Sequence, residues 1–342
     1  EQDCLVVVKS TVPVGTNDRV EQFIKDFLIR KELHIEVASN PEFLAQGSAV
    51  HDTLHAARII IGTESVQAGE KLRKIYEPFQ LPIVAMNRRS AEMTKYACND
   101  FLALKISYMN DIANLCEKMG ADIEKVAEGM SYDARIGANF LKAGIGYGGS
   151  CFPKDTKALK FQANQVGYHL RTVEAAVDVN TEQKIRLFKK ASDRLITFEH
   201  LKVAVLGLAF KPGTDDLREA PSLDNVKLLL DNGADIYAYD PVAAENFRKI
   251  SGGNTWKGND HLCEKSGGCT AGCDNLLYFH RVEGSKDDCT GDLFPKDENT
   301  SCIRWEKCIC ESRYGKGWGG VLQHWKIRKS VLPGCFSSLS FN

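Results

Sequence analysis

Residues 5–16, LVVVKSTVPVGT, decide the fold because they place a strand, a loop and the start of a helix in one run. The apolar residues 5–8 predict a short buried strand, and the amphipathic spacing from Thr16 to Ile29 predicts a helix. Further strands are predicted at 35–39 and 57–62, and a further helix at 66–76. This alternation indicates an α/β fold with a parallel sheet.

The longest helical pattern begins at residues 88–90 and continues without Gly or Pro until Gly120. It carries one apolar stripe at three- and four-residue steps, formed by Met93, Ala97, Phe101, Leu104, Tyr108, Ile112 and Leu115. Residues 102, 106 and 113 form a second apolar face, which indicates a helix covered on two sides. Such a helix suits a connector between domains or a subunit interface.

A second α/β unit follows a helix predicted at 173–195. It consists of a strand at 202–207, a helix at 221–231 and a strand at 235–239. A single βαβ unit supplies too little sheet for a stable domain, so this second sheet is expected to be incomplete.

Bulk properties exclude several classes of protein. The 342 residues carry a formal net charge of −1, which argues against nucleic-acid binding. No apolar run approaches the ~18 residues of a membrane span, and no signal peptide opens the chain. Because the first residues run straight into a strand, we expect that the chain has lost its beginning. Beyond Ile250 the composition changes, since all four tryptophans and eight of the twelve cysteines lie there without hydrophobic periodicity.

Residues 144–155, GIGYGGSCFPKD, carry the most informative chemistry. Pro153 suits the first turn of a helix predicted at 154–166, so Cys151 lies just ahead of a helix N-terminus, where a thiolate is favoured. The preceding glycines let a substrate approach closely. With a lysine and an aspartate within four residues, Cys151 is interpreted as a nucleophile. The same glycines match a Gly-x-Gly-x-x-Gly dinucleotide fingerprint, which we reject because no convincing strand precedes them.

Three other polar sites each allow two interpretations. Glu42 follows a strand at capping-box spacing from Ser39, and it also suits a carboxylate that orders water or acts as a base. Lys95, one turn before Asn99, is either a solvated lysine or a fixed charge beside a developing oxyanion. The loop 210–219 is either a solvated surface loop or a phosphate- or ribose-binding loop at a strand end.

In this order, the segments resemble those of the nucleotide-sugar dehydrogenases. The matching stretches are 10–16 (STVPVGT), 40–44 (NPEFL), Lys95-x-x-x-Asn99, 146–155 (GYGGSCFPKD) and 207–211 (GLAFK), and the match covers about residues 1–250. The cysteine segment is similar to the branch of the family that acts on UDP-glucose. The branch that acts on UDP-N-acetylmannosamine typically carries Gly-His-Cys.

The resemblance implies an α/β fold of Rossmann-like parallel sheets, both incomplete, joined by a central long-helix dimerisation region. It divides the chain into a remnant of an NAD-binding domain at 1–86 and a central helical and catalytic-cysteine region at 87–198. A partial UDP-sugar-binding domain at 199–250 and a non-family tail at 251–342 follow.

The resemblance also implies a reaction, the NAD-dependent two-step oxidation of UDP-glucose to UDP-glucuronate by a cytoplasmic homodimer or larger homo-oligomer. Cys151 would attack the aldehyde formed first, and the resulting thiohemiacetal would become a thioester that water hydrolyses. The implied catalytic residues are Cys151, Lys95 and Asn99 at the oxyanions, Glu42 in hydrolysis, and Asp155 and Thr11 at the water. The implied substrate contacts are Phe140, Leu141, Lys142, Gly148, Phe210 and Lys211, with Arg135 reaching a neighbouring subunit's substrate. The implied NAD contacts are Thr11, Gln46, Lys154 and Arg218, and Gln46 stands where many relatives carry a glutamate.

Other interpretations stay open. The substrate could be another nucleotide sugar, such as GDP-mannose or UDP-N-acetylmannosamine. The chain could also be an inactive UDP-sugar-binding or oligomerisation module, because the family's NAD fingerprint should precede residue 1. In the tail, Cys269-x-x-x-Cys273 and Cys308-x-Cys310 lack regular zinc-ligand spacing, so no metal site is predicted. Translation in a wrong frame or a chimeric join is the favoured explanation of the tail.

Overall fold

The computed structural model describes residues 3–29, 32–251, 260–263, 275–278 and 301–304. It divides into two compact units. The first comprises Glu1–Ser107 and Ser150–Asp178, and the second comprises Tyr108–Gly149 and Val179–Asn342.

The first unit is built on a four-stranded sheet in the order β1-β2-β3-β4. The strands are β1 (Cys4–Val8), β2 (Ile35–Ser39), β3 (Ile59–Gly62) and β4 (Ile83–Met86). The three predicted strands are confirmed, whereas β4, which has no fully buried residue, was not predicted. β2 meets β3 antiparallel through Ser39 and Gly62, while the other two pairs are parallel. The expectation of a purely parallel sheet is therefore wrong at this one pair.

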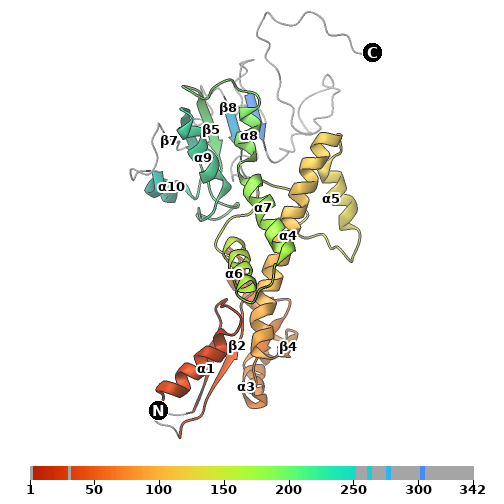
Figure 1. Ribbon diagram of the computed structural model, residues 1–342, viewed down its shortest axis with the longest axis vertical. Helices are drawn as coiled ribbons and strands as arrows, with labels where there is room; N and C mark the ends of the chain where they lie inside the picture. The colour runs from red at the N-terminus through yellow and green to blue at the C-terminus, as the bar shows by residue number, and fades with distance from the viewer. Residues whose placement is uncertain (1–2, 30–31, 252–259, 264–274, 279–300, 305–342) are drawn as a thin grey trace, which may run out of the picture. The chain divides into compact units, whose positions relative to one another are not determined.

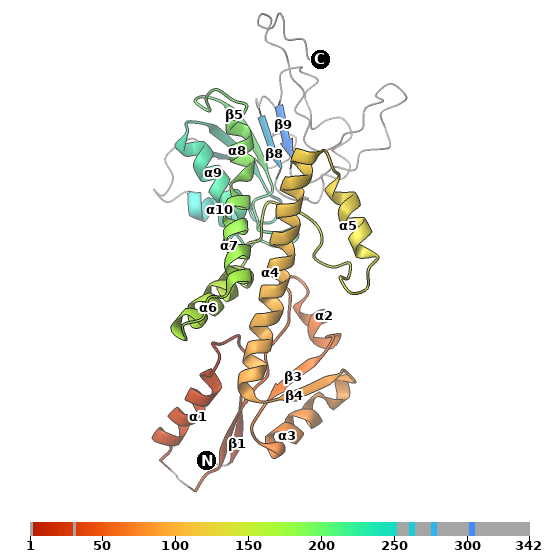
Figure 2. The ribbon, with the colours of Figure 1, turned by 45° about the vertical axis from the view of Figure 1, so that its right-hand side comes forward.

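Two predicted helices pack on this sheet (Figure 2). α1 (Thr16–Phe27) packs on β2, and α3 (Val66–Tyr76) packs on β2 and β3. The short helices α2 (Ala49–Leu54) and η1 (Glu77–Phe79) were not predicted. The core under the helices includes Ala38, Ile59, Ile61 and Leu72.

The start of α1 depends on a carboxylate from a different helix. Its N-cap, Gly15, has φ 88° and no side chain that could accept a hydrogen bond from the first turn. Glu92 of α4 (Arg88–Met119) supplies the acceptors: Oε2 accepts from Gly15 N at 2.6 Å, and Oε1 accepts from Asn17 N at 2.8 Å and from Asn17 Nδ2 at 2.6 Å. Gln162 of α6 (Phe152–Gln165) bonds both backbone groups of Val14. The loop before α1 is therefore held by two helices.

Helix α4 has an exposed apolar stripe and a buried polar face. Within the predicted stripe, Met93, Phe101, Tyr108 and Leu115 are 42–61% exposed. The buried polar residues of α4 are Arg88, Glu92, Lys95, Asn99, Asp100, Ser107 and Asn110. The described residues of the chain itself therefore leave these four stripe residues uncovered. Although α4 has 32 residues, no described helix is long and apolar enough to cross a membrane.

The second unit is built on a five-stranded parallel sheet (Figure 1). The strands are β5 (Lys202–Leu206), β6 (Asp235–Tyr239), β7 (Asp260–Leu262), β8 (Asn275–Tyr278) and β9 (Ser301–Arg304). Their spatial order, β7-β6-β5-β8-β9, is that of a Rossmann-like sheet. The last three strands in the chain lie beyond Ile250, in the predicted tail. All four tryptophans and both zinc candidates of that tail lie outside the described residues.

Helices of the second unit cover this sheet (Figure 1). α9 (Pro221–Asp231) packs on β6, and α10 (Ala244–Ser251), which was not predicted, packs on β7.

A further helix of the second unit, α5 (Ile123–Ser131), begins at Asp122, whose side chain accepts hydrogen bonds from Glu124 N and Lys125 N.

The helix predicted at 173–195 is broken at Ile185 into α7 (Arg171–Lys184) and α8 (Arg186–Ser192). The cause is Asn225 of α9. Its Nδ2 donates to Lys184 O at 2.6 Å, and its Oδ1 accepts from Phe188 N at 3.0 Å. In a continuous helix, these two backbone groups would bond to each other.

We expect Glu92→Ala to lower the free energy of unfolding of the first unit by at least about 3 kcal/mol, because two buried donors on Asn17 and the half-buried Gly15 N–H lose a charged acceptor. Chemical denaturation measures this loss. The exposed Glu70→Ala, which removes a surface pair with Arg73, is the control and should change stability by less than about 0.5 kcal/mol. Equal effects of the two substitutions would contradict the role of Glu92.

Candidate active site

Cys151 occupies the N-cap position of α6, with Pro153 in the first turn. The helix begins two residues before the predicted start, at Phe152. The thiol is exposed, and Ser150 Oγ lies 3.8 Å from its Sγ. The predicted placement of this cysteine at a helix N-terminus is confirmed.

One turn further along α6, Asp155 is a buried carboxylate with two partners. Its Oδ2 accepts from Asn99 Nδ2 at 2.6 Å, and its Oδ1 accepts from Lys154 Nζ at 2.5 Å. Asp155 is 1% exposed and Asn99 is 7% exposed, so water competes little for this contact. The structure thus joins two predicted catalytic residues from helices far apart in the sequence.

Lys95 and Glu42 form a second pair in the same unit. Lys95 Nζ lies 3.2 Å from Glu42 Oε1, and the lysine side chain is 4% exposed. The alternative of a solvated lysine is therefore wrong. Glu42 Oε2 accepts from Leu44 N at 2.7 Å, and residues 40–45 are not helical, so the capping-box alternative is wrong as well. A buried ammonium without this carboxylate would be strongly unfavourable, which ties the loop to α4.

The loop that carries Glu42 is also fixed at its start. Asn40 is 1% exposed, and its Nδ2 donates to Ile60 O at 2.7 Å. Its Oδ1 accepts from Lys9 Nζ at 2.8 Å and from the hydroxyl of Tyr76. Asn40 thus links three separate segments of the first unit, a role that the sequence did not indicate.

Two buried titratable groups beside this cluster were also missed. Asp100 is 3% exposed, and neither of its carboxyl oxygens has a hydrogen-bond partner among the described residues. Burial, and then the charge of Asp155, raise the pKa of Asp100 to about 7. Burial, and then the charges of Asp155, Asp100 and Glu92, raise the pKa of Tyr96 to about 12. The groups that surround Asp100 and Tyr96 come together only in the folded chain, so no local sequence motif could have revealed these two residues.

In the second unit, the glycine run packs against the loop that follows β5. A Cβ on Gly149, which has φ 80°, would lie 2.8 Å from the Phe210 ring, and a Cβ on Gly148 would lie 2.4 Å from Glu219 O. Gly149 N donates to Arg218 O at 2.8 Å. These two glycines therefore permit a close approach of the protein's own Phe210 ring and Glu219 backbone.

The loop after β5 also lies where open α/β sheets bind ligands. β5 pairs with β6 on one side and with β8 on the other, so the order of strands reverses there. Phe210 and Lys211 follow the carboxyl end of β5, and Lys211 Nζ lies 5.5 Å from the Phe210 ring centroid. These two predicted substrate residues and Gly148 thus occupy one region of the second unit.

The other predicted residues have different surroundings. Arg218 forms a two-pronged pair with Asp216, and the exposed Arg135 pairs in the same way with Asp133. Phe140 has φ 64° and is 41% exposed, Leu141 is buried and Lys142 is exposed. Thr11 is half-buried in the loop after β1, and Gln46 is exposed in the turn before α2.

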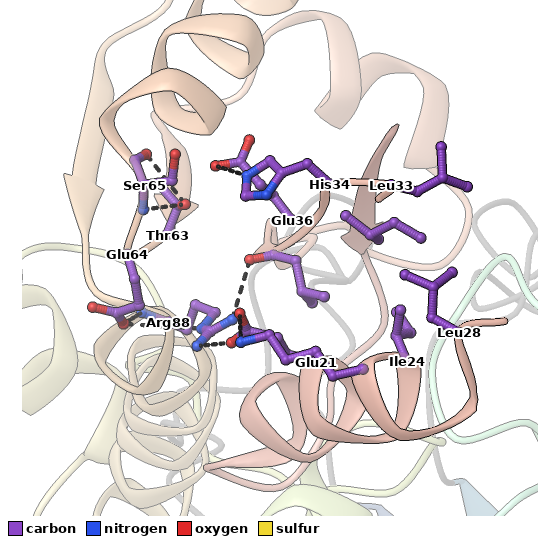
Figure 3. A pocket seen from close by; sticks show the side chains of 13 residues that line it. Glu21, Ile24, Leu28, Leu33, His34, Glu36, Thr63, Glu64, Ser65 and Arg88 are labelled. Carbon is purple, nitrogen blue, oxygen red and sulfur yellow. Dashed lines mark hydrogen bonds and ion pairs between the residues drawn. The ribbon is translucent and has the colours of Figure 1, made fainter. Parts of the chain in front are cut away.

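A pocket of ≈ 470 Å³ opens in the first unit beside α1 and the first half of β2 (Figure 3). Arg88 lies against it and pairs with Asp18 at 3.0 Å and with Glu21 at 2.7 Å. No residue that the sequence predicts for the site is among its described lining residues. The pocket is therefore separate from the cysteine and lysine cluster of the same unit.

The fit of the chain to NAD can be judged from the first helix. Thr11 offers a polar group at the carboxyl end of β1, where open α/β sheets bind ligands. The first N–H groups of α1, which could hold a phosphate, are already bonded to Glu92. The described residues at the strand ends therefore suit contacts with NAD, whereas the N-terminus of α1 does not offer a binding site for its pyrophosphate.

The second unit thus has a Rossmann-like strand order, and the first carries a cysteine at a helix N-terminus and a buried lysine–glutamate pair. Three sequence models of one family match the chain. They are the NAD-binding domain at residues 1–80, the central domain at 89–182 and the UDP-binding domain at 204–278. The chain belongs to the UDP-glucose/GDP-mannose dehydrogenase family. The UDP-binding match continues past Ile250, where the resemblance was expected to end.

Named relatives agree with this family. UDP-glucose 6-dehydrogenase YwqF of Bacillus subtilis is 51% identical over 250 residues, which are 73% of this chain and 57% of the relative. UDP-glucose 6-dehydrogenase of Pseudomonas aeruginosa is 52% identical over 248 residues, which are 71% of this chain and 55% of the relative. The chain thus spans little more than half the length of these relatives. The solved structure of a UDP-glucose dehydrogenase from Pyrobaculum islandicum is similar with a TM-score of 0.82 and 34% identity, over 90% of this chain and 68% of that one. The predicted family and fold class are confirmed.

We expect Asp100→Asn to change how the stability of the first unit depends on pH. In the folded protein, the pKa of the Asp100 carboxyl is raised from 3.8 to about 7. The contribution of Asp100 to the free energy of unfolding is therefore greatest at low pH and is lost as the pH rises from about 4 to about 7. Asn does not titrate, so the variant does not lose stability in this way. Its free energy of unfolding relative to that of wild type should therefore rise between about pH 4 and about pH 7 by up to roughly 4 kcal/mol.

Denaturant unfolding at several pH values measures this difference. The exposed Asp26→Asn in α1 controls for the removal of one negative charge. A difference between Asp100→Asn and wild type that stays constant from pH 4 to pH 8 would contradict the raised pKa.

Proposed function

We propose that the protein oxidises UDP-glucose to UDP-glucuronate in two NAD-dependent steps through a thioester on Cys151. The observation that carries this proposal is the pairing of Lys95 with Glu42 and of Asn99 with Asp155 in the unit that also carries the exposed Cys151 thiol. The printed names of the relatives at 51% and 52% identity support UDP-glucose as the substrate.

Cys151 is the nucleophile of this scheme. Its thiolate, at the N-terminus of α6, attacks the aldehyde carbon at C6 of the sugar, and a carbon–sulfur bond forms as the carbonyl oxygen becomes an oxyanion. The ammonium of Lys95 and the amide of Asn99 stabilise that oxyanion. Loss of a hydride from the thiohemiacetal then gives the thioester. NAD, when bound, supplies the hydride acceptor for both oxidations.

Hydrolysis completes the reaction. The Glu42 carboxylate takes a proton from a water molecule that Asp155 and Thr11 hold, and the resulting hydroxide adds to the thioester carbon. The carbon–sulfur bond breaks, the carboxylate product forms and Cys151 leaves as a thiolate. The contact of Glu42 with Lys95 holds that carboxylate near the oxyanion.

We assign UDP-sugar binding to the second unit. Phe210, Lys211 and Gly148 share its ligand-binding region, and the match to the family's UDP-binding domain supports this assignment. The family resemblance adds Phe140, Leu141 and Lys142 as sugar contacts and Arg135 as a residue for a neighbouring subunit's substrate. For NAD, we propose contacts from Thr11, Gln46, Lys154 and Arg218, with the match to the NAD-binding domain as support.

A homodimer or larger homo-oligomer is part of the proposal. The exposed stripe on α4 repeats at positions 93, 101, 108 and 115, close to seven-residue steps, which suits packing against a second helix. A row of large exposed apolar side chains is unfavourable in water unless a partner covers it. A second copy of α4 would provide that cover.

We retain a cytoplasmic location and the domain layout as proposals. The free thiols of the described residues include Cys4, Cys98, Cys116, Cys151 and Cys263, as expected in a reducing compartment. The family matches support an NAD-binding remnant, a central region and a UDP-binding domain. Because the third match reaches residue 278, the wrong-frame or chimeric origin, expected for the tail 251–342, is proposed only for its part beyond residue 278.

We expect the chain to produce two NADH per UDP-glucose and Cys151→Ser to abolish this double oxidation, because a serine hydroxyl is a far weaker nucleophile. Absorbance of NADH with limiting UDP-glucose measures the ratio. Cys4→Ser, which alters another exposed thiol, should retain a ratio of two. Larger turnover with GDP-mannose or UDP-N-acetylmannosamine would reassign the substrate. UDP-glucose binding in calorimetry, without NAD binding or NADH release, would instead indicate a binding module.

We expect Phe101→Glu to convert the oligomer into a monomer, since it places a charge within the α4 stripe. Light scattering after size-exclusion chromatography gives the mass. Val50→Glu, which changes a residue of α2 that is 77% exposed, should leave the mass unchanged. A wild-type chain that is already monomeric would contradict the oligomer.

A further inference from the structure

Arg58 contacts both segments that carry the Lys95–Glu42 pair. It is half-buried directly before β3, and its guanidinium carbon lies 3.8 Å from the centroid of the Phe43 ring. Its Nη2 lies 3.3 Å from Cys98 Sγ. Phe43 is the next residue after Glu42, and Cys98 lies on α4 three residues after Lys95. One side chain therefore connects the loop to the helix.

Phe43 is also close to the catalytic lysine itself. Lys95 Nζ lies 5.1 Å from the same ring centroid, so two cations interact with one aromatic ring. The planar guanidinium of Arg58 can stack on the ring while its edge reaches the sulfur. The short distance to Phe43 is consistent with such stacking.

Hydrogen bonds to other segments fix both ends of this loop, and its middle is held by side-chain contacts with Lys95 and Arg58. Asn40 is anchored at one end, and at the other end Ala45 N donates to Asp52 Oδ2 at 2.8 Å. Between them, residues 41–45 form no helix or strand. Arg58 holds the middle of the loop, where Glu42 and Phe43 lie.

We propose that Arg58 is a positioning residue that fixes the Glu42 carboxylate against Lys95 by stacking on Phe43 and contacting Cys98. It has no direct role in the chemistry. Its catalytic consequence rests on the proposed function: with Arg58 removed, Glu42 is displaced and the hydrolysis of the thioester on Cys151 slows.

The first test needs no substrate. Acetic anhydride labels exposed lysines, and mass spectrometry of the peptides measures the extent at each position. We expect Arg58→Ala to raise labelling of Lys95 about 10-fold, because its carboxylate partner moves away and the ammonium opens to solvent. Lys190, paired with Glu117 in the second unit, should remain unchanged and reports global unfolding. Arg58→Lys, which keeps the charge without the planar stack, should give a smaller increase, and Arg73→Ala on α3 should give none.

The second test uses UDP-glucose and NAD. We expect Arg58→Ala to lower kcat at least about 10-fold while the KM for UDP-glucose changes less than about 3-fold, since a displaced base slows chemistry more than binding. Intact mass spectrometry should detect accumulation of the acyl group on Cys151. A merely structural role would not produce this adduct.

The two tests separate the possible failures. If the wild-type chain forms no NADH, the proposed function fails, and the labelling of Lys95 still decides the role of Arg58. Unchanged labelling of Lys95, or an equal rise at Lys95 and Lys190, would overturn the proposal. Unchanged kcat in Arg58→Ala of an active chain would overturn it too.

Discussion

A charge buried on a helix has to be paired, and this constraint organises the first unit around α4. Within two turns of that helix, Glu92, Lys95 and Asn99 are each at most 7% exposed. Each of them reaches a different segment, namely the start of α1, the loop after β2 and the start of α6. Breaking any of these pairs leaves an unsatisfied buried group, so the segments that bear Thr11, Glu42 and Asp155 have well-defined positions.

In the second unit, too, single residues determine how the backbone folds and packs. The amide of Asn225 substitutes for a helical hydrogen bond and separates α7 from α8. Gly148 and Gly149 have no side chains, and this leaves room for the backbone oxygen of Glu219 and the ring of Phe210. The loop after β5 is thereby packed against the glycine run that leads to Cys151. This gives the glycines a structural reason that is independent of any ligand.

The sequence predicted what is periodic or local. Strands such as β1 and β2, helices such as α1, α3 and α9, and the place of Cys151 at a helix N-terminus all follow from apolar spacing, Pro153 and turn residues. It could not predict contacts between distant segments. Glu92 and Asn17 are separated by 75 positions, and Asn225 breaks a helix 37 positions before it. The antiparallel meeting of β2 and β3 involves one residue pair and leaves no pattern in either strand. The same limit hid Arg58, because its neighbours Phe43 and Cys98 become adjacent only in the folded chain.

We infer that α4 fixes the proposed catalytic groups through buried pairs, and a double-mutant cycle on Lys95 and Glu42 tests this inference most directly. Lys95→Met, Glu42→Gln and the double variant are compared with wild type by denaturant unfolding. Because the lysine is 4% exposed and 3.2 Å from the carboxylate, the two effects should be non-additive by more than about 1 kcal/mol. Additive effects, within about 0.5 kcal/mol, would show that the pair is not energetically coupled and would contradict the account.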